Sequence, residues 1–75
     1  MKNPSGIKAF GTHLRRIREA KGISQQELAD RANLSKSTIL RTENAKFAVT
    51  LDALLSISEA LEIPLKDLID FPVNQ

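Results

Sequence analysis

Apolar residues recur along this chain at intervals of three and four, the spacing that places side chains on one face of an α-helix. The first helix is predicted over residues 7–21, and its apolar face consists of Ile7, Phe10, Leu14 and Ile17. Gly22 follows directly and can take the left-handed conformation that ends a helix. The basic Lys21 in the last turn complements the helix dipole.

Two short helices are predicted next, separated by a turn of three or four residues. Residues 24–27, Ser-Gln-Gln-Glu, match the capping box that begins a helix. This helix ends at Asn33, since asparagine tolerates the left-handed backbone better than most residues. Ser35 then caps a third helix of about nine residues that ends near Asn44. Two helices joined this closely are typical of a helix-turn-helix.

The last third of the chain predicts one longer and one very short helix. Thr50 caps the fourth helix, and its predicted inward positions are Leu51, Leu54, Ile57 and Leu61. Leu55 lies on the flank of that apolar stripe. Pro64 begins the fifth helix, whose predicted inward positions are Leu65, Leu68 and Ile69. No segment has the alternation of a strand, so the expected fold is an all-α bundle of five helices.

The composition agrees with one small soluble domain and excludes several kinds of chemistry. The chain has 75 residues, no cysteine and a single histidine, which excludes disulfides, thiolate metal sites and His-pair zinc sites. Residues 1–6 are predicted to form a mobile arm, 7–71 the domain and 72–75 a tail. No apolar stretch approaches the length of a membrane span or a signal peptide, which favours a cytoplasmic protein.

Charge divides the chain into two unlike parts, although the net charge is only +2. Residues 1–46 carry ten basic and four acidic side chains. From residue 47 onward, Lys66 stands against five acidic side chains. A polyanion is therefore expected to approach the first three helices.

These segments together resemble a known family, the phage-repressor and Cro-like helix-turn-helix domains of the xenobiotic-response-element type. The resemblance covers residues 10–69 and centres on residues 23–29, on 33–35, and on Ile39 and the Glu43-Asn44 pair. It implies a lambda-repressor-like DNA-binding domain, commonly dimeric, whose third helix enters the major groove while the second lies across the backbone.

Three positions depart from the family pattern. Asn33 and Ala45 stand where the family usually has glycine, and Ala45 is the less favourable if that position requires a positive φ. Thr42 replaces a usual apolar residue, which is expected to weaken the packing of the third helix.

The outer face of the third helix is the predicted surface for base contacts, formed by Lys36, Ser37, Leu40 and Arg41. Arg41 is the first candidate, because a guanidinium can donate two hydrogen bonds to guanine O6 and N7. Leu40 suits a thymine methyl group. The alternatives are that Leu40 packs on a neighbouring helix and that Arg41 is only solvated.

Phosphate contacts are expected at both ends of the helix-turn-helix, from Gln25, Ser35, Asn44 and Lys46. Gln25 lies in the first turn of the second helix, where free amides and the helix dipole attract an anion. The roles of Asn44 and Lys46 are implied by the resemblance, and Lys46 is equally well an ordinary surface lysine. The resemblance also implies a structural ion pair between Arg18 and Glu43. His13 is assigned no role and is expected on the surface.

The leading hypothesis is a sequence-specific transcriptional regulator that binds palindromic duplex DNA as a homodimer. The candidate dimer contacts are Leu55, Phe71 and Val73, and Phe71 alternatively closes the core. The other hypothesis is a protein-binding module of antitoxin or adaptor type, with secondary DNA binding. An enzyme is not expected, because no phosphate loop, metal spacing or partnered nucleophile is present. No cofactor or metal is implied.

Overall fold

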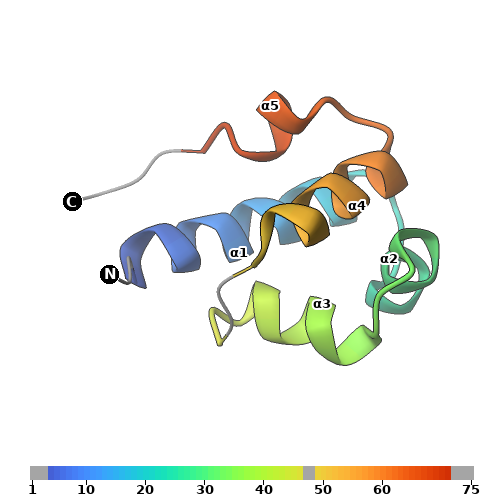
Figure 1. Ribbon diagram of the computed structural model, residues 1–75, viewed down its shortest axis with the longest axis horizontal. Coiled ribbons are helices and arrows are strands. Elements are labelled where there is room, and N and C mark those ends of the chain that lie inside the picture. The colour runs from blue at the N-terminus through green and yellow to red at the C-terminus, as the bar shows by residue number, and fades with distance from the viewer. Residues whose placement is uncertain (1–3, 47–48, 72–75) are drawn as a thin grey trace.

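The computed structural model describes residues 4–46 and 49–71, which form five helices and no strand. The helices are α1 (Pro4–Ala20), α2 (Gln25–Ala32), α3 (Lys36–Glu43), α4 (Leu51–Leu61) and α5 (Leu65–Leu68). In Figure 1, α5 lies on one side of α1 and α4, and α2 and α3 lie on the other. The expected all-α fold of five helices is therefore confirmed.

Side-chain caps begin three of these helices where the sequence predicts them. The Ser24 hydroxyl accepts a hydrogen bond from the Glu27 amide, and the Glu27 carboxylate accepts one from the Ser24 amide, which completes the capping box. Ser35 and Thr50 cap α3 and α4 in the same way, by accepting from the amide three residues on. These caps fix the starting points of α2, α3 and α4.

The core joins all five helices through large aliphatic side chains. Those buried almost completely are Leu14, Leu28, Ile39, Ile57, Leu61 and Leu68. Each such side chain contributes about 1.5–3 kcal/mol relative to an exposed position. The core therefore holds Ile39 of α3 in place and turns the opposite face of that helix to solvent.

The structure corrects three expectations about where helices begin and which residues face the core. Helix α1 starts at Pro4 rather than Ile7, so residues 4–6 of the predicted arm are helical and residues 1–3 lie outside the described part. Leu51 is 64% exposed, because the buried face of α4 is centred on Ala53 and Ile57. Ile69 is 47% exposed, since α5 ends at Leu68.

The positions that depart from the family pattern have distinct conformations. Asn33 takes the left-handed conformation with φ 57°, as predicted for the end of α2. Ala45 also has a positive φ, 59°, which is unfavourable for a residue with a Cβ. Glu62 ends α4 with φ 57°, a feature that the sequence did not indicate. Thr42 is buried, and its hydroxyl donates to the Thr38 carbonyl, so the extra polar group is satisfied within α3.

Within residues 4–46 and 49–71, none of the helices combines the length and the apolar character needed to cross a membrane.

Candidate nucleic-acid interface

Helix α3 presents the four predicted base-contacting residues to solvent. Lys36, Ser37, Leu40 and Arg41 are all exposed, whereas Ile39 on the opposite face is fully buried. Leu40 is 43% exposed and is not part of the core. In Figure 1, α3 lies at the edge of the molecule farthest from α5. The outer face of α3 is therefore accessible to a large partner.

The C-terminal end of α3 packs against α1 at a glycine that the sequence analysis did not single out. A Cβ on Gly11 would lie 2.6 Å from the Thr42 carbonyl oxygen and 2.8 Å from that of Glu43. Only a residue without a side chain allows two backbones to approach this closely. A glycine within an otherwise regular helical pattern is the available signal for such a contact.

The ion pair implied between Arg18 and Glu43 is present and almost fully buried. The Arg18 Nε and Nη2 atoms donate to the two Glu43 carboxylate oxygens at 2.7 and 3.1 Å. The remaining guanidinium nitrogen, Nη1, donates to the Ile23 carbonyl at 2.9 Å. The hydrogen bond to Glu43 raises the pKa of Arg18, so the guanidinium stays charged. Arg18 thus links α1, the turn after it and the end of α3.

The side chain of Gln25 is part of the same cluster. Its Nε2 atom donates to Glu43 Oε1 at 3.2 Å. Because a carboxylate only accepts hydrogen bonds, this contact requires the amide nitrogen, rather than its oxygen, to face Glu43. One N–H of Gln25 is therefore committed within the protein. The amides in the first turn of α2 remain the more direct donors for an anion at this helix end.

The other predicted phosphate contacts lie at the two ends of α3. Ser35 is exposed, but its hydroxyl caps the helix and also lies 2.8 Å from the Thr38 hydroxyl. Asn44 is the C-cap of α3 and is exposed, as is Lys46. Ser35 and the Asn44–Lys46 segment therefore lie on the same part of the surface as the exposed face of α3.

An open cleft brings together residues from the first three helices. It has a volume of about 480 Å³, and its lining includes Arg15, Gln25, Lys36, Leu40 and Asn44. Arg15, which the sequence analysis does not single out, lies beside the predicted contacts. Ser37 and Arg41 lie on the same helix outside this cleft.

The charge division of the chain follows the order of the helices. Helices α1–α3 contain most of the basic side chains, while α4 and α5 with their flanking segments carry Asp52, Glu59, Glu62, Asp67 and Asp70. The exposed face of α3 belongs to the basic part. No group of histidine, aspartate or glutamate side chains suited to a metal ion occurs in the described part of the chain.

The predicted dimer contacts have different surroundings. Leu55 is 42% exposed on α4, and Leu51 is exposed one turn before it. Phe71 is half-buried and packs on Phe10 of the core, with ring centroids 5.8 Å apart. The geometry therefore favours the alternative in which Phe71 closes the core. Val73 lies outside the described residues.

His13 is more engaged than the predicted surface position implies. Its Nε2 atom lies 3.0 Å from the Asp67 carbonyl oxygen, and its ring centroid lies 5.6 Å from that of Phe71. The residue is half-buried between α1 and the segment that includes α5. No local pattern indicates this contact, because its partners lie more than fifty residues away along the chain.

Comparison with known proteins identifies similar sequences and folds. Residues 14–68 match a family described as helix-turn-helix, HTH_3. The chain is 40% identical over 63 residues to the control protein C.BamHI of Bacillus amyloliquefaciens, covering 83% of this chain and 78% of that protein. It is 38% identical over 64 residues, 85% of this chain, to the putative HTH-type transcriptional regulatory protein MJ1164 of Methanocaldococcus jannaschii. The match spans only 20% of that archaeal protein.

A solved structure has the same fold. The restriction-modification controller protein C.AhdI from Aeromonas hydrophila superposes with a TM-score of 0.81 at 35% sequence identity. The match covers 83% of this chain and 94% of that one.

Proposed function

Because this chain belongs to the helix-turn-helix family, we propose that it is a transcriptional regulator that binds duplex DNA through the outer face of α3. The observation that carries the proposal is the division of α3 into a buried face and an exposed one. Ile39 and Thr42 are buried, whereas the four outer residues reach solvent from the basic part of the molecule.

Each outer residue of α3 has a chemistry that suits a base edge. Arg41 can donate two parallel hydrogen bonds to guanine O6 and N7, which discriminates against other bases by about 1–3 kcal/mol. Lys36 can donate to the same acceptors, and Ser37 can serve a base or a phosphate. Leu40 can contact a thymine methyl group, which supplies a reason for an exposed leucine on this surface.

Phosphate contacts at both ends of the motif then set the position of α3 in the groove. The first turn of α2 offers backbone amides beside Gln25, and Ser35, Asn44 and Lys46 lie around α3. Arg15 adds a cation in the cleft that includes Gln25 and Asn44. Such contacts supply affinity and orientation, while sequence is read by the base contacts.

We further propose that the protein acts as a homodimer on palindromic sites. Helix-turn-helix dimers place their reading helices in two half-sites about 34–36 Å apart. The exposed Leu51 and Leu55 of α4, in the acidic part of the chain, form the proposed interface. A regulator of this kind acts in the cytoplasm and needs neither cofactor nor catalytic activity.

The proposal is tested by selecting bound duplexes from a random pool and by measuring affinity as a function of salt. Selection is expected to yield a palindrome. Replacing both Lys36 and Arg41 by alanine is expected to abolish the preference for that site and to flatten the salt dependence. Lys66→Ala is the matched control, since it removes a cation from the acidic part and is expected to change neither property.

A protein-binding module is the second candidate, favoured by the exposed Leu51 and Leu55 of α4 and the exposed Ile69 directly after α5. Thr42 offers no contact to such a partner, because that residue is buried and hydrogen-bonded within α3. A selection without sequence preference, with affinity unaffected by the Lys36 and Arg41 substitutions, would contradict DNA reading by α3 and favour this second candidate.

A further inference from the structure

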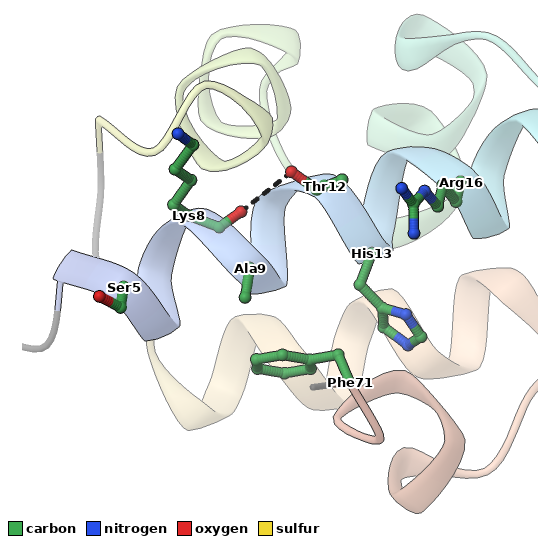
Figure 2. A pocket seen from close by; sticks show the side chains of 7 residues that line it. All are labelled: Ser5, Lys8, Ala9, Thr12, His13, Arg16 and Phe71. Carbon is green, nitrogen blue, oxygen red and sulfur yellow. Dashed lines mark hydrogen bonds between the residues drawn. The ribbon is translucent and has the colours of Figure 1, made fainter. Parts of the chain in front are cut away.

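A second cavity lies on the outer side of α1, separate from the α3 surface. It has a volume of about 350 Å³ and is lined by Ser5, Lys8, Ala9, Thr12, His13, Arg16 and Phe71. Figure 2 shows the Phe71 ring next to Ala9, with the His13 ring beside it and Arg16 further along α1. The cavity therefore combines a flat apolar surface with cationic and hydroxyl groups.

The polar lining is suited to an anion. Lys8 and Arg16 are cations, Ser5 carries a hydroxyl, and none of the seven lining residues is a carboxylate. The Thr12 hydroxyl donates to the Lys8 carbonyl oxygen at 3.1 Å, so its hydrogen is already committed (Figure 2). His13 also lines the cavity. Since its Nε2 atom faces the Asp67 carbonyl, which only accepts, that nitrogen carries a proton and the ring orientation is fixed. In that tautomer the other ring nitrogen is an acceptor, so His13 contributes its flat ring to the cavity rather than a donor.

The apolar part of the cavity is held by the core. The Phe71 ring packs on Phe10, which is buried, and on the His13 ring. A flat group that enters beside Ala9 can stack on the Phe71 ring without displacing it. A preformed aromatic surface lowers the cost of ordering on binding.

The cavity and the α3 surface lie on different faces of α1. Gly11 and Arg18 face α3, through the close backbone contact and the ion pair. Ala9 and His13 face Phe71. Occupation of the cavity therefore leaves the exposed face of α3 uncovered, and the site does not depend on the function proposed above.

We propose that this cavity binds a small planar anion, an aromatic ring that carries a carboxylate or a phosphate group. The ring stacks on Phe71 beside Ala9, and the anionic group is held by the Arg16 guanidinium. The volume is near the lower end of the range for small-molecule sites, about 300–1,000 Å³, which suits one ring with one charged group.

The test is a titration of the full chain with small anionic probes. Binding is monitored through the backbone and side-chain NMR signals of each residue. Benzoate and phenyl phosphate are the two probes, and they distinguish a carboxylate from a phosphate ligand. Saturable shifts are expected at Thr12, His13, Arg16 and Phe71. Inorganic phosphate, which lacks the ring, and benzyl alcohol, which lacks the charge, are expected to bind at least about tenfold more weakly.

A matched pair of variants distinguishes the cavity from general attraction to a basic protein. Arg16→Gln is expected to raise the dissociation constant about three- to tenfold, since it removes a charge-assisted hydrogen bond. Arg15→Gln removes the same charge from the other side of α1 and is expected to leave the dissociation constant unchanged. Both side chains are exposed, so both variants retain the fold. Equal effects of the two variants, shifts that do not saturate, or shifts confined to α2 and α3 would overturn the proposal.

Discussion

The Thr42 carbonyl oxygen of α3 lies only 2.6 Å from the position that a Cβ on Gly11 of α1 would occupy. This contact, together with the Arg18–Glu43 ion pair, fixes the C-terminal end of α3 against α1. The N-terminal end is fixed by the Ser35 cap and the short turn from α2. The proposed reading surface is thus held by the protein before any partner binds.

Gly11→Ala is therefore expected to destabilise the fold, although alanine is the better helix former. The added methyl group meets two backbone oxygens that cannot rotate away, and such overpacking costs about 1–3 kcal/mol, which exceeds the gain of at most about 1 kcal/mol from helix propensity. Urea unfolding measures the difference. Thr12→Ala, the exposed neighbour, is expected to change stability by less than about 0.5 kcal/mol. Equal stability of Gly11→Ala and the unmodified chain would show that α1 and α3 lie farther apart in solution than this backbone contact requires.

The buried ion pair is expected to behave as a unit. Arg18→Met leaves the Glu43 carboxylate buried without its partner, and Glu43→Leu leaves the guanidinium in the same position, so each costs about 3–5 kcal/mol. The double variant is expected to lose less free energy of unfolding than the sum of the two single losses. A double-mutant cycle, measured by urea unfolding at low temperature, gives the difference. Additive losses would mean that the two side chains do not interact.

Ala45→Gly is expected to stabilise the protein by about 0.5–1 kcal/mol, because the left-handed conformation costs alanine more than glycine. Ala20→Gly is the matched control at a helical position of α1, and there the same substitution is expected to destabilise by about 0.5–1 kcal/mol. Thermal unfolding of both variants measures the two effects. A loss of stability in Ala45→Gly would indicate that residue 45 does not have a positive φ in solution.

Substitutions of two leucines with nearly equal exposure, Leu55 and Leu40, distinguish self-association from DNA binding. Leu55→Ser on α4 is expected to weaken self-association about tenfold, because an apolar contact is lost from both copies. Leu40→Ser on α3 is expected to leave association unchanged and to weaken duplex binding. Sedimentation measures the first property and a binding isotherm the second. Unchanged association of Leu55→Ser would show that this part of α4 is not the interface.

The sequence predicts the helix boundaries well where a local signal exists. Ser24, Ser35 and Thr50 cap their helices, and Gly22 and Asn33 have the positive φ expected where helices end. These signals are side-chain hydrogen bonds and backbone preferences within three or four residues. They are therefore readable from the chain alone.

The features that sequence reasoning missed are those set by distant segments. Leu51 continues the aliphatic spacing of α4, but the helix packs through the smaller Ala53 and Ala60, which turns Leu51 outward. His13 contacts the Asp67 carbonyl, a partner that no local pattern identifies. The exposure of the α3 surface follows from the structure, whereas the contacts that its residues make with DNA remain predictions.

The separation of charge between the two parts of the fold gives the two proposed equilibria opposite responses to ionic strength. Contact between two copies through α4 brings their acidic sides together, and dissolved ions weaken that repulsion, so added salt favours pairing. The same ions compete with the basic side for phosphates, so added salt releases the duplex. If both proposals hold, occupancy of a palindromic site is expected to be greatest at an intermediate ionic strength, where paired molecules have formed and counterions do not yet displace them.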